Sequence, residues 1–195
     1  MSKDAKEILH PYDHEHSHVE EVPWSRLGSL LVRLAETISE SYRPELVVGI
    51  AKGGAVPGVY LSSAFLVDFF PIKLSSRHNE QVVSSVPVWH VYPTEQVSGK
   101  RVLLVDEICV NGRTLGMAKA ELLRRGAEEI KTATLAVHHG SVRPDYYALD
   151  SDGLIVWPWD RDTLAPDATW SINREYKDEM DKIEGYLPGP SPASE

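Results

Sequence analysis

The chain has 195 residues, of which 42% are hydrophobic and 25% charged, an ordinary composition for one globular domain with its own core. A formal net charge of −9 argues against non-specific nucleic-acid binding, and no apolar run approaches the roughly 20 residues that cross a bilayer. A single cysteine, Cys109, excludes an intrachain disulfide and fits a reducing compartment, so we expect a cytoplasmic protein that binds neither nucleic acid nor membrane.

The two ends of the chain differ in composition from its middle. Residues 1–22 are polar and rich in histidine and acids, and residues 186–195 are rich in Pro, Ser and Gly. We expect both ends to be weakly structured, which leaves residues 23–185 as one domain. The N-terminal histidines could bind a transition metal, but their irregular spacing favours a solvated segment.

Between these ends, segments of helical periodicity alternate with short apolar runs. The pattern predicts helices over 24–42, 56–67 and 113–125, and strands over 46–50, 69–74, 102–106, 130–137 and 154–157. Continuous apolar strands that alternate with helices indicate an α/β fold with a parallel sheet covered on both faces. Residues 76–99 break the alternation, and they fit a lid or a surface excursion equally well.

The strand predicted over 102–106 ends in two adjacent carboxylates, Asp106 and Glu107. In an open α/β sheet, ligands bind outside the carboxyl ends of the strands. Neighbouring carboxylates at such an end suit sugar hydroxyls or a hydrated divalent cation. The two acids are therefore the first candidate site residues.

A short polar turn follows the acids and leads into the next predicted helix. The unpaired N–H groups of a helix start, together with the helix dipole, favour an anion. Gly112 lets the backbone come close to a ligand, Asn111 and Thr114 add polar groups, and Arg113 adds positive charge. Acids beside an anion-binding turn suit a sugar phosphate, although an ordinary capped helix explains the same residues.

A second loop, GIAKGGAVPG at residues 49–58, also follows a strand and opens a helix. Lys52 supplies a cation, while Gly53 and Gly54 expose the backbone. Two such loops could hold two separate phosphate groups. Neither loop has the GxxxxGK[ST] or GxGxxG pattern, which excludes the common nucleotide-binding fingerprints.

Together these stretches resemble the type I phosphoribosyltransferases. VLLVDEICVNGRT, residues 102–114, is similar to the family's phosphoribosyl pyrophosphate (PRPP) motif, and IAKGGAVPG, residues 50–58, is similar to its pyrophosphate loop. The second loop has the form typical of bacterial and archaeal xanthine-guanine phosphoribosyltransferases. RPDYYALDSDGLIVWPWD, residues 143–160, resembles the segment that builds the purine site in those enzymes.

The resemblance implies the type I phosphoribosyltransferase fold, a Rossmann-like parallel-sheet core. It also implies a small hood at about residues 140–185 and a flexible lid over residues 78–98. The implied reaction is Mg²⁺-dependent transfer of phosphoribose from PRPP to xanthine, guanine or hypoxanthine, as in purine salvage. Since relatives are commonly dimers or tetramers, it implies a homodimer or homotetramer.

Roles follow for the residues that match the family's motifs. The implied PRPP-binding residues are Ala51, Lys52, Gly53, Gly54, Asp106, Glu107, Val110, Asn111, Gly112, Arg113 and Thr114. The implied base-binding residues are His138, Leu154, Ile155, Trp157 and Asp160. Asp106, Glu107, Lys52 and His138 would be catalytic, and Asp106, Glu107 and Asp160 would hold the Mg²⁺. The Ala51–Lys52 peptide is a candidate for the cis form.

The chain departs from the purine enzymes on the base side. Val110 stands where an Asp usually handles the proton of the base, and Leu154 stands where an aromatic ring often stacks on it. A lysine that meets the 6-oxo group is missing, and His138 is the nearest group that titrates near neutrality. These departures leave open an alternative, a PRPP- or nucleotide-binding regulator of the same fold with little or no turnover.

Overall fold

The computed structural model describes residues 16, 18–75, 77–78, 81–82, 87–139 and 142–189. The chain divides into two compact units. The first, which we call the core unit, contains Leu30–Asp150, and the second, the hood unit, combines Pro11–Ser29 with Ser151–Glu195. The predicted hood boundary near residue 140 therefore moves to Ser151, because the residues just before it complete the sheet of the core unit.

The core unit is built on a six-stranded sheet in the order β6-β3-β2-β7-β8-β9. Neighbouring strands are parallel except for β6, which runs antiparallel to β3. The strands are β2 (Leu46–Ile50), β3 (Asp68–Ser75), β6 (Val88–Val91), β7 (Arg101–Cys109), β8 (Glu129–Val137) and β9 (Tyr146–Asp150). Two short strands, β4 (Arg77–His78) and β5 (Gln81–Val82), pair antiparallel between β3 and β6 in the chain. The predicted parallel-sheet core is confirmed.

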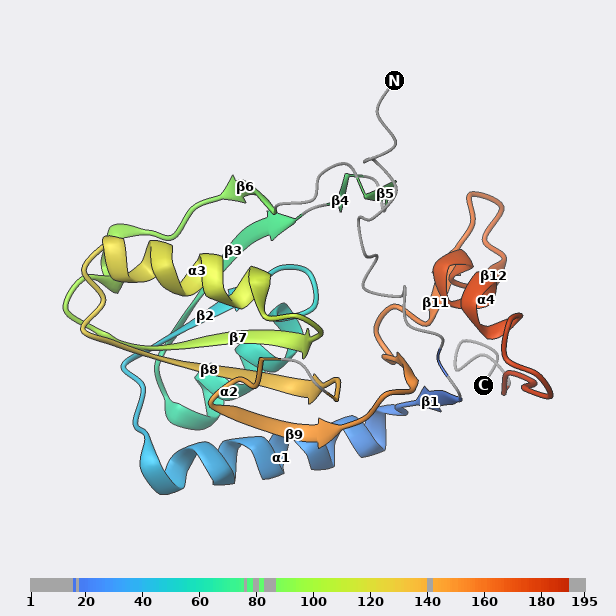
Figure 1. The fold of residues 1–195 in the computed structure, drawn as a ribbon, viewed down its shortest axis with the longest axis horizontal. Helices are drawn as coiled ribbons and strands as arrows, with labels where there is room; N and C mark the ends of the chain where they lie inside the picture. Colours follow the sequence, from blue (N-terminus) through green and yellow to red (C-terminus); the bar gives the residue numbers. More distant parts are fainter. Residues whose placement is uncertain are drawn as a thin grey trace. The chain divides into compact units, whose positions relative to one another are not determined.

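Three helices cover this sheet, and Figure 1 shows α3 on one side with α1 and α2 on the other. They are α1 (Trp24–Ser41), α2 (Ala55–Phe65) and α3 (Arg113–Arg124), and a 3₁₀ turn, Glu95–Val97, precedes β7. Successive residues of β7 are fully buried on alternate faces: Leu104 packs in the cluster beneath α3, and its neighbour Leu103 points to the opposite face. This double burial explains the uninterrupted apolar run in the sequence.

The described part of the hood unit contains two small sheets, the helix α4 and the first residues of α1. β1 (Val19–Glu21) pairs parallel with β10 (Leu154–Val156), β11 (Asp162–Leu164) pairs antiparallel with β12 (Trp170–Ile172), and α4 spans Arg174–Met180. The predicted strand over 154–157 is thus β10, and it belongs to the hood. The weak structure expected up to residue 22 needs correction, because Val19–Glu21 form a strand.

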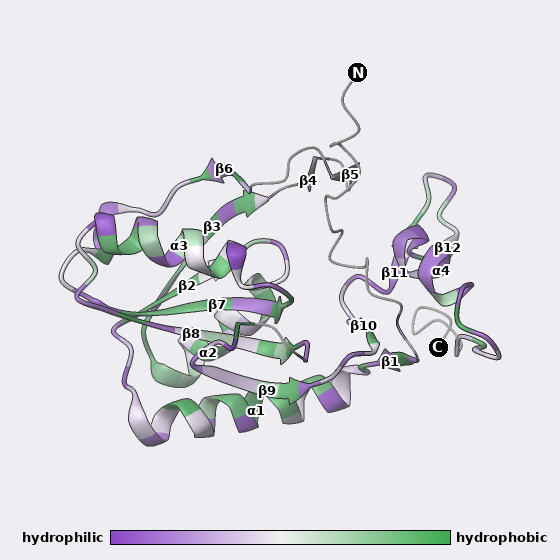
Figure 2. Ribbon diagram, viewed as in Figure 1, coloured by the Kyte–Doolittle hydropathy of each residue, from purple (hydrophilic) through white to green (hydrophobic). Residues whose placement is uncertain are grey.

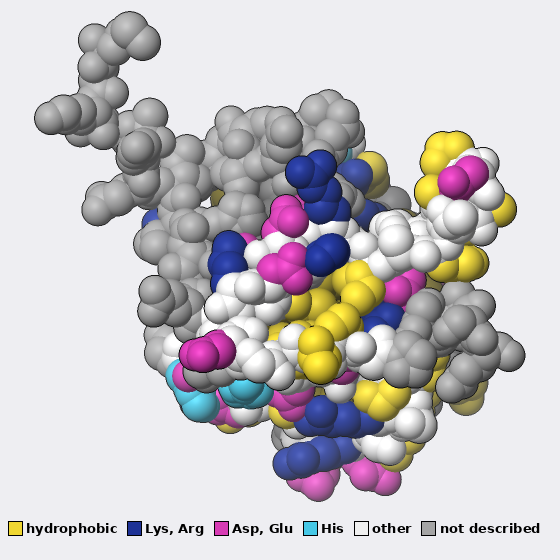
Figure 3. Space-filling view, turned by 90° about the vertical axis from the view of Figure 1, so that its right-hand side faces the viewer, with side chains coloured by type: hydrophobic (Ala, Val, Ile, Leu, Met, Phe, Trp, Pro, Cys, Tyr) yellow, Lys and Arg dark blue, Asp and Glu magenta, His cyan; other side chains and the backbone are white. Residues whose placement is uncertain are grey.

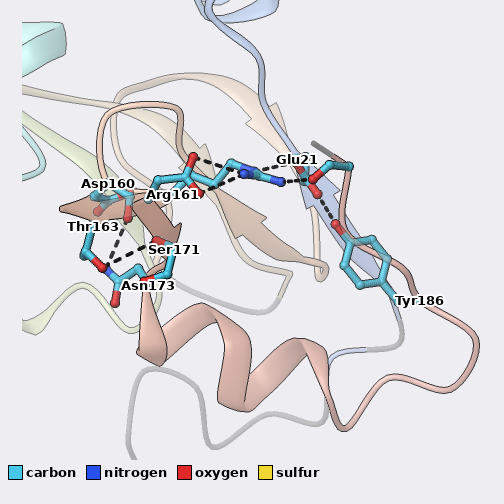
Figure 4. A network of polar contacts seen from close by, with 9 residues as sticks. Glu21, Asp160, Arg161, Thr163, Ser171, Asn173 and Tyr186 are labelled. Atoms are coloured by element: carbon cyan, nitrogen blue, oxygen red, sulfur yellow. Dashed lines mark hydrogen bonds and ion pairs between the residues drawn. The ribbon is translucent and has the colours of Figure 1, made fainter. Parts of the chain in front are cut away.

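A polar network holds the hood unit together (Figure 4). Arg161 is only 4% exposed, and its guanidinium donates to Glu21 at 2.9 Å, to both carboxylate oxygens of Asp162 at 3.0 Å, and to the carbonyl of Gly189 at 2.6 Å. The hydroxyl of Tyr186 also donates to Glu21. The expectation of weak structure from residue 186 onward needs correction at Tyr186 and Gly189, which bond to this network, while residues 190–195 lie outside the described residues.

In the part of the chain that the structure describes, no helix is both long and apolar enough to span a membrane. In Figure 3, acidic and basic side chains are interspersed among apolar ones, so the coloured residues of that face form no broad basic surface.

Candidate active site

Two loops follow adjacent parallel strands at one edge of the core sheet. Residues 51–54, the Lys52 loop, follow β2, and residues 110–114, the Asn111 loop, follow β7 and lead into α3. The register pairs Gly49 with Val105, so Asp106 and Glu107, the acid pair, lie beside the end of β2. Figure 2 shows a hydrophilic band near the end of the otherwise apolar strand β7, just before its hydrophobic tip. The sequence predicted this meeting of acids and loops at the carboxyl ends of the strands.

The Lys52 loop is fixed by backbone hydrogen bonds and by close packing. Ala51 N–H donates to the carbonyl of Ile72, and Gly54 N–H donates to that of Ile50, each at 2.8 Å. The Ala51–Lys52 peptide is cis, as the resemblance implied. A Cβ on Gly54 would lie 2.3 Å from the carbonyl oxygen of Val105, so the absence of a side chain lets this loop pack directly on β7.

Asp106 is buried at the end of β7. The residue is only 8% exposed, and its Oδ1 accepts a hydrogen bond from Glu107 N–H at 3.0 Å. Burial raises the pKa of Asp106 well above its usual range, and the negative charge of Glu107 raises that pKa further. The protein thus places two carboxyl groups side by side, and ionisation of the buried one, Asp106, is energetically unfavourable.

This acid pair fits a hydrated Mg²⁺. Its donors are carboxylate oxygens, which Mg²⁺ prefers, and a divalent cation would offset the repulsion between them. Among the described residues, no three His, Cys, Asp or Glu side chains gather to hold a metal by themselves. The cation would therefore complete its shell with water and ligand oxygens, as Mg²⁺ usually does beside one or two carboxylates.

The Asn111 loop bends sharply at Gly112. Gly112 has a φ of +73°, in the left-handed region that favours glycine, and Arg113 N–H donates to the side-chain oxygen of Asn111 at 3.0 Å. Val142 supports the turn from outside, since a Cβ on Gly112 would lie 3.0 Å from Val142 Cβ. The thiol of Cys109 donates to the Val142 carbonyl at 3.1 Å. No sequence pattern identified this support, because Val142 lies between β8 and β9, far along the chain.

His138 lies at the carboxyl end of β8, in the core unit. The residue is 7% exposed, and its backbone N–H donates to the carbonyl of Cys109 at 3.1 Å, continuing the pairing of β7 with β8. The neighbouring His139 instead contacts Asp150 at 2.9 Å, and Arg143 reaches the same carboxylate at 2.9 Å. The structure therefore places His138 at the predicted edge, and its proton-handling role stays a prediction.

The other predicted base-binding residues belong to the hood unit. Leu154 packs in the hood core with Val156, so Ile155 points to the opposite face of β10. Trp157 stacks on Trp159 with ring centroids 5.1 Å apart. The side chain of Leu154 is therefore used for packing within the hood.

Asp160, the third predicted metal ligand, is also engaged within the hood unit. Its Oδ1 accepts from the Tyr176 hydroxyl at 2.8 Å, and its backbone carbonyl accepts from the Asn173 side chain at 3.1 Å. These bonds give Asp160 a structural role that the sequence did not indicate.

The predicted lid is described only in part. Its C-terminal section includes β6, where Trp89 and Tyr92 stack with ring centroids 4.9 Å apart. Residues 79–80 and 83–86 lie outside the described residues. Closure over a ligand stays a prediction.

Comparison with known proteins agrees with this geometry. A family described as phosphoribosyl transferase domain matches residues 23–165. Hypoxanthine-guanine phosphoribosyltransferase of Schizosaccharomyces pombe is 24% identical over 70% of this chain and 86% of that protein. The crystal structure of purine phosphoribosyltransferase from Pyrococcus horikoshii is 31% identical, with a TM-score of 0.65 over 72% of this chain and 93% of its own.

A second similar structure, xanthine-guanine-hypoxanthine phosphoribosyltransferase of Helicobacter pylori, shares the fold at 18% identity. Its TM-score is 0.62 over 73% of this chain and 93% of its own. The family match covers most of the chain, including both loops and the acid pair. The chain therefore belongs to the phosphoribosyl transferase domain family, a class of transferase enzymes.

Proposed function

We propose that this protein transfers phosphoribose from PRPP to a 6-oxopurine, namely xanthine, guanine or hypoxanthine, in an Mg²⁺-dependent reaction of purine salvage in the cytoplasm. The observation that carries the proposal is the placement of the acid pair beside the Lys52 and Asn111 loops at one sheet edge. PRPP has the matching order of groups, a phosphate, two ribose hydroxyls and a pyrophosphate. The purine preference rests on the relatives from Pyrococcus and Schizosaccharomyces, whose names specify purine bases.

The residues of the two loops account for the chemistry. A purine nitrogen forms a bond to C1 of the ribose while the bond from C1 to the pyrophosphate oxygen breaks, and the proton that this nitrogen loses passes to a base, for which His138 is the candidate. Positive charge develops on the sugar, and negative charge develops on the leaving group, which the Lys52 ammonium and the backbone of its loop stabilise. Bound Mg²⁺ would supply further neutralisation of the pyrophosphate. Asp106 and Glu107 orient the ribose through its hydroxyls or through the cation.

One alternative has specific support on the base side. Val110 cannot accept a proton, and Leu154 is committed to the hood core. Both observations favour a PRPP- or nucleotide-binding regulator with little turnover. Turnover with each base decides between the two functions.

The division of the site between two loops can be tested with the two halves of PRPP. Calorimetric titrations would measure binding of PRPP, pyrophosphate and ribose 5-phosphate, each with Mg²⁺. We expect Lys52→Met to weaken the binding of PRPP and of pyrophosphate about tenfold or more, because a charge-assisted contact contributes about 1.5–3 kcal/mol. Ribose 5-phosphate should bind Lys52→Met and the wild type equally.

The matched control is Lys100→Met, which removes an exposed lysine just before β7, at the opposite end of that strand from the acid pair. This control should bind all three ligands as the wild type does. Equal weakening of pyrophosphate and ribose 5-phosphate by Lys52→Met would contradict the assignment of the loops. Failure of the wild type to bind PRPP would contradict the proposed function itself.

A further inference from the structure

The carboxylate of Glu107 lies directly against Gly53 of the Lys52 loop. A Cβ built on Gly53 would lie 1.7 Å from Glu107 Oε2, 1.8 Å from Cδ and 2.2 Å from Oε1. The position that a side chain would take at Gly53 is thus filled by the carboxyl group of Glu107. Both residues belong to the core unit: Gly53 lies in the loop that follows β2, and Glu107 lies on the adjacent strand β7.

This contact puts a negative charge on the loop that the proposed function assigns to the pyrophosphate. An anion that approached the backbone of Gly53 would meet the Glu107 carboxylate at close range and be repelled. The contact depends on the length of the side chain, because an aspartate at this position has one methylene fewer. Asp106 cannot replace it, since Asp106 is buried and its Oδ1 accepts the N–H of Glu107.

The Glu107 side chain can move away from Gly53 more readily than the buried side chain of Asp106 can change its position. Glu107 is half-buried, whereas Asp106 is only 8% exposed. Its carboxylate is attached through a flexible chain, whereas the neighbouring Gly54 packs against the carbonyl of Val105, which belongs to a central strand. A divalent cation at the acid pair would attract the Glu107 carboxylate away from Gly53.

We propose that Glu107 gates the pyrophosphate subsite, occupying it without ligand and vacating it when a divalent cation binds the acid pair. The proposal rests on the proposed function, because it requires the Lys52 loop to bind pyrophosphate. On this account a cation promotes pyrophosphate binding in two ways. It neutralises phosphate charge, as it does for any phosphate, and it also draws the Glu107 side chain out of the subsite.

The gate is tested by the affinity of inorganic pyrophosphate in the absence of divalent cations. Calorimetry in EDTA would compare the wild type with Glu107→Gln, which keeps the length and removes the charge, and Glu107→Asp, which keeps the charge and shortens the arm. We expect Glu107→Gln to bind metal-free pyrophosphate at least tenfold more tightly than the wild type, and Glu107→Asp at least threefold more tightly. Addition of Mg²⁺ should increase the pyrophosphate affinity of the wild type by a larger factor than it increases that of Glu107→Gln.

Glu129→Gln is the matched control, since it removes the same charge from an exposed residue at the start of β8, away from the acid pair. It should bind metal-free pyrophosphate within twofold of the wild type. If the wild type binds pyrophosphate with Mg²⁺ and Glu107→Gln binds the metal-free anion no more tightly than the wild type, the gate is wrong while the proposed function stands. If the wild type binds no pyrophosphate even with Mg²⁺, the proposed function is wrong and the gate with it.

Discussion

Asp106→Asn is expected to make the protein more stable and, at the same time, nearly inactive. The substitution removes a buried carboxyl group, whose pKa is raised by burial and by the negative charge of Glu107. It keeps an oxygen that can accept the N–H of Glu107, so no hydrogen bond of the turn is lost. Removal of an electrostatically unfavourable group from a functional site typically stabilises the folded protein by about 0.5–2 kcal/mol. For a chain of this size, each kcal/mol raises Tm by about 2–4 °C.

The stabilisation should depend on pH in a defined direction. Because the pKa of Asp106 is raised in the folded state, the wild type loses stability as pH rises from the unfolded value, about 3.9, through the folded value. Asparagine does not titrate, so the advantage of Asp106→Asn should be full above the folded pKa and disappear near pH 4. Thermal unfolding between pH 4 and 8 would measure it.

The same variant should lose transfer activity by about 10²–10³-fold, the usual effect of removing one preorganised electrostatic contact to a transition state. Asp68→Asn, an exposed carboxylate at the start of β3, is the control and should change neither Tm nor activity measurably. A variant of Asp106 that is less stable than the wild type at pH 8, or fully active, would contradict the role assigned to this carboxylate.

Arg161→Met is expected to cause the largest loss of stability. Its guanidinium is buried and neutralises Glu21 and Asp162 while donating to the Gly189 carbonyl. Methionine would fill much of the volume and leave both carboxylates without their cation. Removal of one partner from a buried ion pair typically costs about 3–5 kcal/mol. We expect Tm to fall by roughly 6–20 °C at this chain length.

The contrast is with Arg174→Met, which removes an arginine 92% exposed, with its guanidinium 3.8 Å from Asp178. Such a surface pair is expected to contribute nothing measurable. Because the bonds of Arg161 to Glu21, Asp162 and Gly189 all lie within the hood unit, proteolysis of Arg161→Met should begin in the hood, at residues 151–189. Equal melting of the two arginine variants would show that the network around Arg161 contributes little.

The sequence predicted those parts of the site that depend on neighbouring residues in the chain. The apolar run before Asp106, the glycines of the Lys52 loop and the polar turn at Gly112 each follow from local chemistry, and the structure places all three at one sheet edge. The cis peptide at Ala51–Lys52 was implied by the family resemblance and is present.

What the sequence did not predict depends on contacts between distant segments. β9 was missed because its residues lack a continuous apolar run, and its start is secured by Asp145, whose carboxylate accepts the N–H and hydroxyl of Thr132 at 2.8 Å. The pairing of Val19 with Leu154 likewise joins segments far apart in the chain, so the composition of the N-terminus alone suggested weak structure. The contact of Glu107 with Gly53 also arises only when β2 and β7 pair.

Phosphoribosyl transfer itself is tested most directly by incubating the protein with PRPP, Mg²⁺ and one base at a time: xanthine, guanine, hypoxanthine, adenine or uracil. Mass spectrometry would detect the nucleoside monophosphate, and the double variant Asp106→Asn/Glu107→Gln would serve as the control. We predict product from at least one 6-oxopurine, none from uracil, and none from the double variant. Absence of product with every base, from a protein that still binds PRPP, would contradict the transferase function and establish the regulator in its place.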